Sequence, residues 1–161
     1  MQAGDAEQLL EMYRDPSTVE YIGSPPLETI DQMLAGIARR SAHEEEHGFS
    51  LWSVLERASG RLVGECGLQM LEGGPDVELG YKLAGAARGR GYATEAAAAW
   101  IAHGFAVLGL ERIVAVAWPE NAASRRVMEK VGMTLVGPGH HYGHETLLYE
   151  ISRAAPATPA G

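Results

Sequence analysis

A chain of 161 residues with 46% hydrophobic and 21% charged residues has the size and composition of one globular domain, which excludes disordered and fibrous classes. No apolar run reaches the roughly 20 residues that a membrane-spanning helix needs, and the first residues lack the basic and apolar regions of a signal peptide, so we expect a cytoplasmic protein without a membrane partner. The net charge of -8 argues against nucleic acid as a partner, because phosphate binding needs a basic face, and favours cationic ligands.

The first half of the sequence predicts two helices and three strands. The segment Asp5 to Asp15 places apolar residues at helical spacing, and Pro16 forces the preceding residue out of the helix. A second helical pattern covers residues 24–46, where a serine and two prolines precede an apolar face. Turns then separate three apolar segments, and their spacing predicts an antiparallel meander. The three segments are residues 49–56, 61–71 and 76–83.

The second half alternates helix and strand. A helix over residues 93–108 closes on a glycine, a buried strand covers residues 111–118, and Asn121 caps a further helix. Two more strands complete a mixed α/β sheet, so we expect one domain over residues 1–153. The alanine- and proline-rich tail, residues 154–161, is predicted to be disordered.

Glycine and arginine alternate at the junction of the 76–83 strand and the following helix. Gly89 and Gly91 leave backbone amides uncovered and allow positive φ, while Arg88 and Arg90 add charge suited to a diphosphate. Anions bind at such junctions because free amides and the positive end of a helix converge there. The alternative is a glycine turn with two solvated arginines. The stretch is neither a Walker loop nor a three-glycine dinucleotide motif, which disfavours ATP and NAD.

Two segments together resemble the signatures of one family. "RGRGYA", Arg88 to Ala93, is similar to the acyl-CoA pyrophosphate loop of the GNAT superfamily of N-acetyltransferases, and "PENAASRRVMEKVGM", Pro119 to Met133, is similar to its second signature, especially in the RimJ/RimL-like branch. The resemblance extends from Asp5 to Ile151. It implies a mostly antiparallel sheet with helices on both faces, and a V-shaped opening between its two central strands. It also implies acetyl-CoA in that opening and acetyl transfer to a primary amine, either of a small molecule or of a protein N-terminus.

The resemblance also implies where acetyl-CoA binds. A backbone N–H between Tyr81 and Leu83 would polarise the thioester carbonyl, and Asn121 would touch the pantetheine arm or only cap its helix. The residues expected at this site are Tyr81, Lys82, Leu83, Arg88, Gly89, Arg90, Gly91, Tyr92, Ala93, Thr94, Asn121 and Ser124.

Glu78 is the candidate general base. It lies on the strand that borders the predicted opening and faces opposite to its neighbours, so its carboxylate could take the ammonium proton directly or through water. Alternatively it only holds a neighbouring loop or attracts a cationic substrate. Glu65 and Glu95 are weaker rivals, the latter because an acidic residue in a first helical turn favours the helix dipole without catalysis.

Ser124 is the candidate general acid. Many family members carry a tyrosine on the second signature helix, but that position is Met128 here, and a thioether cannot donate a proton. The Ser124 hydroxyl lies one turn earlier and could protonate the leaving thiolate, although it could also merely cap the helix or pack against pantetheine. Tyr92 and Tyr142 are less well placed.

Several other features have simpler interpretations. Cys66 lies in an apolar run, which predicts a buried, unreactive thiol. His140, His141, His144 and Glu145 lie at a predicted hairpin tip where alternate residues face apart, so we expect no metal site and favour a histidine-lined mouth over the acceptor pocket.

The start of the chain departs from the family pattern. Members usually begin with a strand, whereas this chain enters its first helix within five residues of Met1. We favour a truncated sequence; otherwise the sheet exposes an edge that a second copy could cover, giving a homodimer. A CoA-binding regulator that transfers no acetyl group is the alternative function.

Overall fold

The structure of the protein is a computed structural model that describes residues 1–23 and 26–153. The described residues form one six-stranded sheet in which β3 and β4 run parallel and all other neighbours are antiparallel. Its order is β1 (Leu51–Leu55), β2 (Leu62–Met70), β3 (Val77–Leu83), β4 (Arg112–Ala117), β6 (His144–Ser152) and β5 (Thr134–His141). This confirms the predicted α/β class with a mixed, mostly antiparallel sheet.

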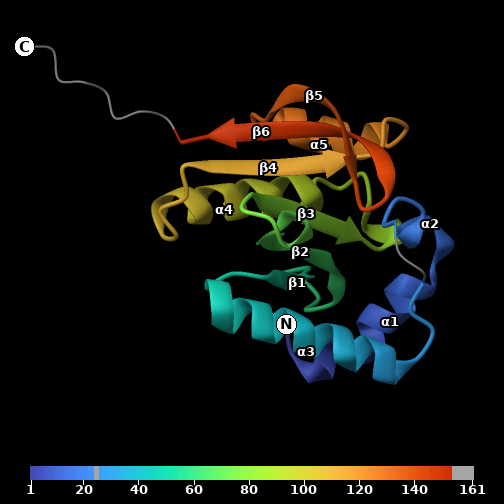
Figure 1. Cartoon of the computed structure of the whole chain (residues 1–161). Coiled ribbons are helices and arrows are strands. Elements are labelled where there is room, and N and C mark those ends of the chain that lie inside the picture. Colours follow the sequence, from blue (N-terminus) through green and yellow to red (C-terminus); the bar gives the residue numbers. More distant parts are fainter. Residues whose placement is uncertain (24–25, 154–161) are drawn as a thin grey trace, which may run out of the picture.

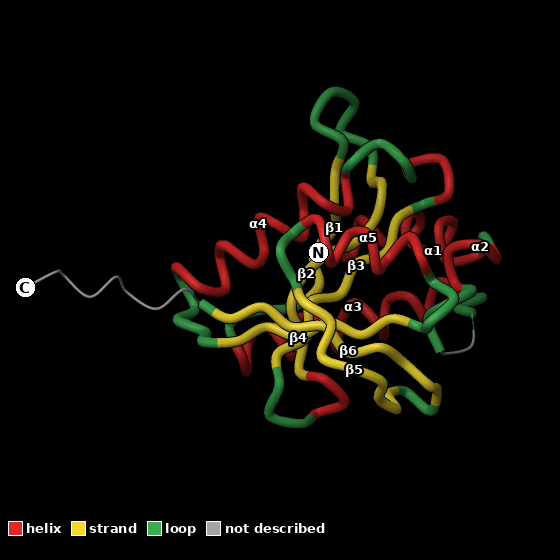
Figure 2. The backbone as a smooth tube through the Cα atoms, turned by 90° about the horizontal axis from the view of Figure 1, so that it is seen from above, coloured by secondary structure: helices red, strands yellow, loops and turns green. Residues whose placement is uncertain are grey.

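Helices cover both faces of the sheet. One core contains side chains of β2, β3 and β4 packed against α4 (Tyr92–Ala106) and α5 (Ala122–Lys130). A second core contains α1 (Ala6–Arg14) and α3 (Ile30–His47). In Figure 1, α1 and α3 lie on the side of β1, away from α4 and α5, and Figure 2 shows β4, β6 and β5 running side by side. The remaining helical segments are α2 (Pro16–Val19) and the 3-10 turns η1 (Ala3–Asp5), η2 (Leu71–Gly73) and η3 (Gly85–Ala87).

Two helix boundaries differ from the sequence prediction. The second long helix begins at Ile30, where Thr29 and Gln32 form a capping box, so the predicted start at residue 24 was wrong; residues 24 and 25 themselves lie outside the described residues. Pro16 ends α1 as expected but also opens α2, because proline fits the first position of a helix. The predicted disordered tail, residues 154–161, also lies outside the described residues.

The two central strands separate along their length. Glu78 of β3 pairs with Val114 of β4, and no other pair joins these strands among the described residues. Beyond Glu78, therefore, β3 has hydrogen-bonding groups that face β4 without being paired to it. This is the predicted V-shaped opening, bordered by Tyr81 to Leu83 on one side and by the end of β4 on the other.

The sheet edge at β1 is partly apolar and exposed. Within residues 1–23 the structure has helical segments and no strand, so β1 forms the edge of the described sheet. Trp52 and Leu55 on β1 are 44% and 56% exposed, respectively. None of the described helices combines the length and apolar character needed to cross a bilayer.

Gly67 allows the entry into β1 to lie close to β2. A Cβ atom at this position would lie 2.0 Å from the carbonyl oxygen of Ser50, which belongs to the backbone and cannot rotate away. We expect Gly67→Ala to lower the free energy of unfolding by about 1–3 kcal/mol in urea denaturation. Gly4→Ala is the control, since a Cβ there meets nothing within 4 Å. Equal stability of the two variants would show that this close approach is absent.

Candidate active site

The loop before α4 leaves backbone amides open to a ligand. Gly89 and Gly91 have φ of 73° and 86°, a conformation that favours glycine, and a Cβ at either position would meet nothing within 4 Å. Gly91 is the N-cap of α4, and the first bond within the helix runs from the Glu95 amide to the Gly91 carbonyl. The amides of Tyr92 to Thr94 therefore point out of the helix end. This geometry fits a diphosphate, as the sequence predicts.

The two loop arginines differ in their surroundings. The guanidinium of Arg88 donates to the carbonyl oxygens of Leu83, at 3.3 Å, and Ser17, at 2.7 Å, so it holds the loop against β3 and α2. Arg90 is 55% exposed and forms an ion pair with Glu56 at 2.8 Å. Arg90 is thus the arginine whose charge faces outward from the loop, and the contact of either with acetyl-CoA stays a prediction.

Glu56, which follows β1, contacts two residues at the start of α4 and in the loop before it. It accepts hydrogen bonds from the hydroxyls of Ser59 and Tyr92 as well as from Arg90. These bonds lower the pKa of the Glu56 carboxyl to about 2, those from Ser59 and Tyr92 contributing most. The Tyr92 hydroxyl is therefore held by a carboxylate that follows β1.

Ser124 and Tyr81 meet across the opening. The Asn121 side chain accepts from the Ser124 amide at 3.0 Å, which confirms the predicted cap of α5. The Tyr81 hydroxyl lies 2.9 Å from both the carbonyl and the hydroxyl oxygen of Ser124. Since a phenol has one proton to donate, the arrangement suits a Tyr81 donating to the carbonyl and accepting from the serine hydroxyl. Sequence reasoning missed this partner, because only the backbone of Tyr81 was considered.

Glu78 lies on the opposite face of the same strand. It is 5% exposed, and its carboxylate accepts hydrogen bonds from Gln69 Nε2, at 2.8 Å, and from the Tyr142 hydroxyl. Burial raises the pKa of Glu78 above its ordinary value, although both hydrogen bonds act in the other direction. A buried carboxylate with a raised pKa is a stronger proton acceptor than an exposed one, as a general base requires.

Tyr142 reaches Glu78 from a strained turn. It occupies the β5–β6 hairpin with φ of 54°, which is rare for a residue with a bulky side chain, and its amide donates to Glu72 at 2.7 Å. Figure 1 shows this hairpin curling over the end of β4. A tyrosine with a left-handed backbone conformation is a reason to look for a function. Here the Tyr142 phenol donates a hydrogen bond to the candidate base, Glu78.

A buried ion cluster lies further along the same face. Glu65 on β2 is fully buried, and its Oε1 accepts from Tyr13 at 2.6 Å, Arg40 at 3.0 Å and Lys82 at 3.0 Å. Burial alone would raise the pKa of Glu65, but the two cations hold it below its ordinary value, so this carboxylate stays ionised. Glu65 is therefore held by α1, α3 and β3, which makes it a structural partner and a poor general base.

The ion cluster holds the side chain of Lys82 away from the opening. Its ammonium group lies with Glu65 on the face of α1 and α3, and the expected contact of Lys82 with acetyl-CoA, which concerns its backbone, stays a prediction. Ser124 and the phenol of Tyr81 lie on the other face, so only the backbone of Lys82 borders the opening. Glu95, a rival to Glu78, lies exposed in the first turn of α4, which fits its interaction with the helix dipole.

The histidines of the hairpin do not gather around one point. His141 contacts Glu72 at 3.2 Å, while His144 packs on Trp118 and lines a separate hollow of about 400 Å³. Across residues 1–23 and 26–153, no group of three or more metal-ligating side chains is arranged to hold an ion. Cys66 is 1% exposed, and burial raises the pKa of its thiol to about 12, which confirms the prediction of an unreactive cysteine.

A family model and solved structures define the class of the protein. The model of the acetyltransferase (GNAT) domain matches residues 1–134, and the chain therefore belongs to the GNAT acetyltransferase family. An uncharacterized N-acetyltransferase of Bacillus subtilis, YoaA, is 28% identical over 142 residues, which cover 88% of this chain and 80% of that one.

Two solved structures have the same fold. A GNAT-family acetyltransferase from Bacillus anthracis is 26% identical with a TM-score of 0.81, over 94% of this chain and 91% of the other. RimJ of Mycobacterium smegmatis, solved in complex with CoA-disulfide, has a TM-score of 0.77 at 22% identity, over 94% and 79% of the two chains.

The role of Gly91, the N-cap of α4, can be tested by comparing it with another glycine of positive φ. We expect Gly91→Val to weaken acetyl-CoA binding about tenfold or more in calorimetry, because valine at positive φ must distort the loop that presents the amides. Gly109→Val is the control: it has φ of 68° and equally open surroundings, but follows the other end of α4. If both variants bind acetyl-CoA equally well, the loop is not the binding site.

Proposed function

We propose that the protein transfers the acetyl group of acetyl-CoA to a primary amine by direct attack of the amine in a ternary complex. The observation that carries this proposal is the placement of two chemical groups on opposite faces of β3. Glu78 lies on the face of α1 and α3, and the Tyr81–Ser124 hydroxyl pair lies on the face of α5. An acceptor and a thioester could thus approach the opening from opposite sides.

The residues of the α4 junction fit the diphosphate of the donor. The amides of Tyr92, Ala93 and Thr94 would bind its oxygens, with Arg90 close by. When bound, acetyl-CoA supplies a thioester carbon that an amine can attack. Unpaired backbone groups of β3 beyond Glu78 would polarise the carbonyl of this thioester.

Glu78 acts as the general base in this proposal. Glu78 first takes the proton of the substrate ammonium, directly or through one water molecule; the neutral amine nitrogen then bonds to the carbonyl carbon, and the carbon–sulfur bond breaks. Gln69 and Tyr142 orient the carboxylate for this transfer.

In this proposal the Ser124 hydroxyl turns its proton from Tyr81 to the leaving sulfur, and the serine recovers a proton from the Tyr81 phenol, which solvent reprotonates. Burial raises the pKa of the Tyr81 phenol, so it is protonated before the reaction and orients the serine hydroxyl. We also propose that the chain belongs to the RimJ/RimL-like branch, because Pro119 to Met133 is similar to the second signature of that branch. We also propose that the enzyme is cytoplasmic, because its composition is that of a globular domain and no apolar run is long enough to span a membrane.

Incubation of the protein with acetyl-CoA and a panel of amines tests the proposal directly. We expect release of free thiol that depends on the amine, and a mass increase of the acceptor by one acetyl group. Acetyl-CoA binding in calorimetry without thiol release from any amine would favour a CoA-binding regulator in its place.

Removal of the base should change both rate and pH dependence. We expect Glu78→Gln to lower kcat/KM at neutral pH about 100-fold, and we expect the activity of this variant to recover partly at high pH, where the amine is already neutral.

Tyr142→Phe removes a hydrogen bond that stabilises ionised Glu78, so the pKa of Glu78 rises further and the acidic limb of the pH–rate profile moves to higher pH. Glu95→Gln serves as the control. Unchanged profiles in both variants would remove Glu78 from the mechanism.

The hydroxyl pair can be separated from donor binding by steady-state kinetics. We expect Ser124→Ala to lower kcat about tenfold with little change in the KM for acetyl-CoA, because the serine hydroxyl acts after binding. Tyr81→Phe should lower kcat similarly, since it removes the partner that orients Ser124. An increase in KM alone would make Ser124 a residue that binds the donor and leave the proton to solvent.

A further inference from the structure

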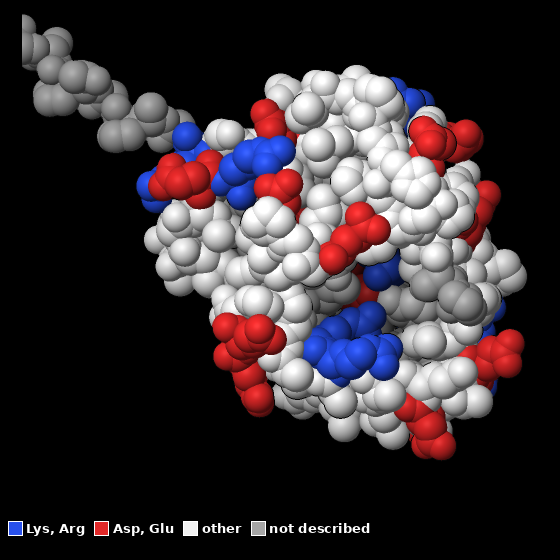
Figure 3. Space-filling model, in the orientation of Figure 1, with Lys and Arg blue, Asp and Glu red and all other residues white. Residues whose placement is uncertain are grey.

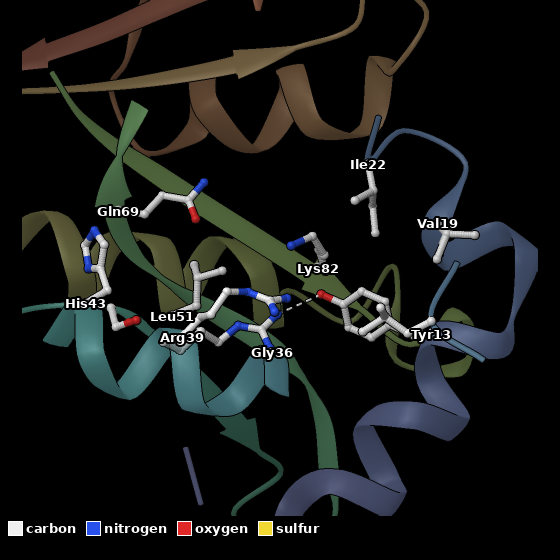
Figure 4. A pocket seen from close by; sticks show the side chains of 12 residues that line it. Tyr13, Val19, Ile22, Gly36, Arg39, His43, Leu51, Gln69 and Lys82 are labelled. Carbon is white, nitrogen blue, oxygen red and sulfur yellow. Dashed lines mark hydrogen bonds between the residues drawn. The ribbon is translucent and has the colours of Figure 1, made fainter. Parts of the chain in front are cut away.

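A cavity of about 310 Å³ lies on the acceptor face of the sheet, between α1, α2, α3 and the strands β1 to β3. Its lining combines polar and apolar side chains. Gln69, which holds Glu78, lies apart from Lys82 and Arg40, and Leu51, Val19 and Ile22 are among the apolar residues of the wall. Figure 4 shows Gln69 and Lys82 on neighbouring strands, with Val19 and Ile22 on the side of the cavity opposite α3. A molecule with two polar ends and an apolar stem would match this arrangement.

The far end of the cavity carries excess positive charge. Arg40 and Lys82 share a single carboxylate, Glu65, and Arg39 adds a further guanidinium at the cavity wall. Burial and the nearby carboxylate raise the pKa of Tyr13, so this neighbour contributes no charge at neutral pH. Figure 3 shows Lys and Arg side chains gathered around a hollow in a surface that otherwise carries many acidic groups. The local charge is thus opposite in sign to the net charge of -8.

One donor of this cluster lacks an acceptor. The Nη1 atom of Arg40 is buried and has no hydrogen-bond partner among the residues that the structure describes. Its neighbour Nη2 donates to both Glu65 and Tyr13, at 3.0 and 3.1 Å. Because a buried donor without a partner is costly, an unpaired guanidinium nitrogen beside a cavity indicates a site for an acceptor supplied from elsewhere.

Gly36 keeps the space beside both arginines open. It is a buried glycine inside α3, where glycine is unfavourable, and it lies three and four residues before Arg39 and Arg40 on the same helix face. A Cβ at this position would lie 3.5 Å from Nη1 of Arg40 and 3.7 Å from Nη2 of Arg39, an ordinary contact. Alanine would therefore fit the fold, but its methyl group would contact both guanidinium groups.

We propose that the acceptor carries an anionic group, a carboxylate or a phosphate, that binds Arg39 and Arg40 beside Lys82 while its amine lies at Glu78. This inference rests on the proposed acetyl transfer. Glu78 and Lys82 are four residues apart on one face of β3, about 13 Å along the strand. The amine and the anionic group therefore belong to opposite ends of the acceptor, joined by a stem of several carbons that packs on the apolar residues of the cavity.

Acceptors of equal length but different end groups test the proposal. They are aminohexanoate with a terminal amine, hexylamine, diaminohexane and aminohexyl phosphate. We expect kcat/KM for aminohexanoate or aminohexyl phosphate to exceed that for hexylamine about tenfold or more, with diaminohexane the poorest acceptor. The ratio of the two anionic compounds distinguishes carboxylate from phosphate. Equal values for all four, or a preference for diaminohexane, would overturn the proposal.

Two variants locate the anion site. We expect Arg39→Gln to lower kcat/KM for the preferred anionic acceptor about tenfold and to leave hexylamine unchanged. Arg153→Gln is the control, since it removes the same charge at the far end of β6, where Arg153 pairs with Glu111. Gly36→Ala should weaken anionic acceptors several-fold while the melting temperature stays the same or rises. Loss of activity with hexylamine as well would assign Arg39 and Gly36 to the fold in place of the site.

Failure of this inference differs from failure of the proposed function. A protein that binds no acetyl-CoA fails the proposed function, whereas one that acetylates hexylamine as well as aminohexanoate fails only the present inference. If none of the four amines is turned over, the affinities of aminohexanoate and hexylamine for the CoA-saturated protein, measured by calorimetry, test the anion site without catalysis. Tighter binding of aminohexanoate, abolished by Arg39→Gln, supports the anion site, and equal binding overturns it.

Discussion

The separation of β3 from β4 is the constraint on which the rest of the site depends. The strands pair at Glu78 and Val114 and then diverge, so the backbone of β3 beyond this point faces an opening. Alternation along β3 sends Glu78 and Lys82 to one face and Tyr81 to the other. One strand thus presents the proposed base on one face of the sheet and the proposed hydroxyl pair on the other.

Local sequence signals could predict most of the elements, the conformation of the loop before α4 and the cap of α5. The glycines at 89 and 91 and the Asn121 cap act within a few residues, where turn and capping preferences are strong. The start of α3 was missed because the capping box at Thr29 competes with a more familiar serine and proline signal upstream. The face of Glu78 followed from the period of the strand alone.

Contacts between distant residues could not be predicted in the same way. Tyr142 reaches Glu78 across 64 positions, and Arg40 reaches Glu65 across 25. Neither spacing has a local signature, because both depend on how the hairpin and α3 pack on the sheet. The contact of Gln69 with Glu78 is easier to predict, since the register of β2 and β3 places the two residues opposite each other. Net charge does not reveal local gatherings of charge either: Arg39, Arg40 and Lys82 line one cavity of a chain whose net charge is -8.

The Glu65 cluster also bears on how the acceptor side responds to a ligand. Its carboxylate joins Tyr13, Arg40 and Lys82, and through them α1 and α3 are fastened to β2 and β3. Displacing α3 would part opposite charges inside a medium of low dielectric constant, which is costly. The cavity wall is therefore preorganised, and an acceptor that fits it loses its own freedom on binding but orders little of the protein. For the proposed acceptors, discrimination would then arise from a rigid template and not from closure around the ligand.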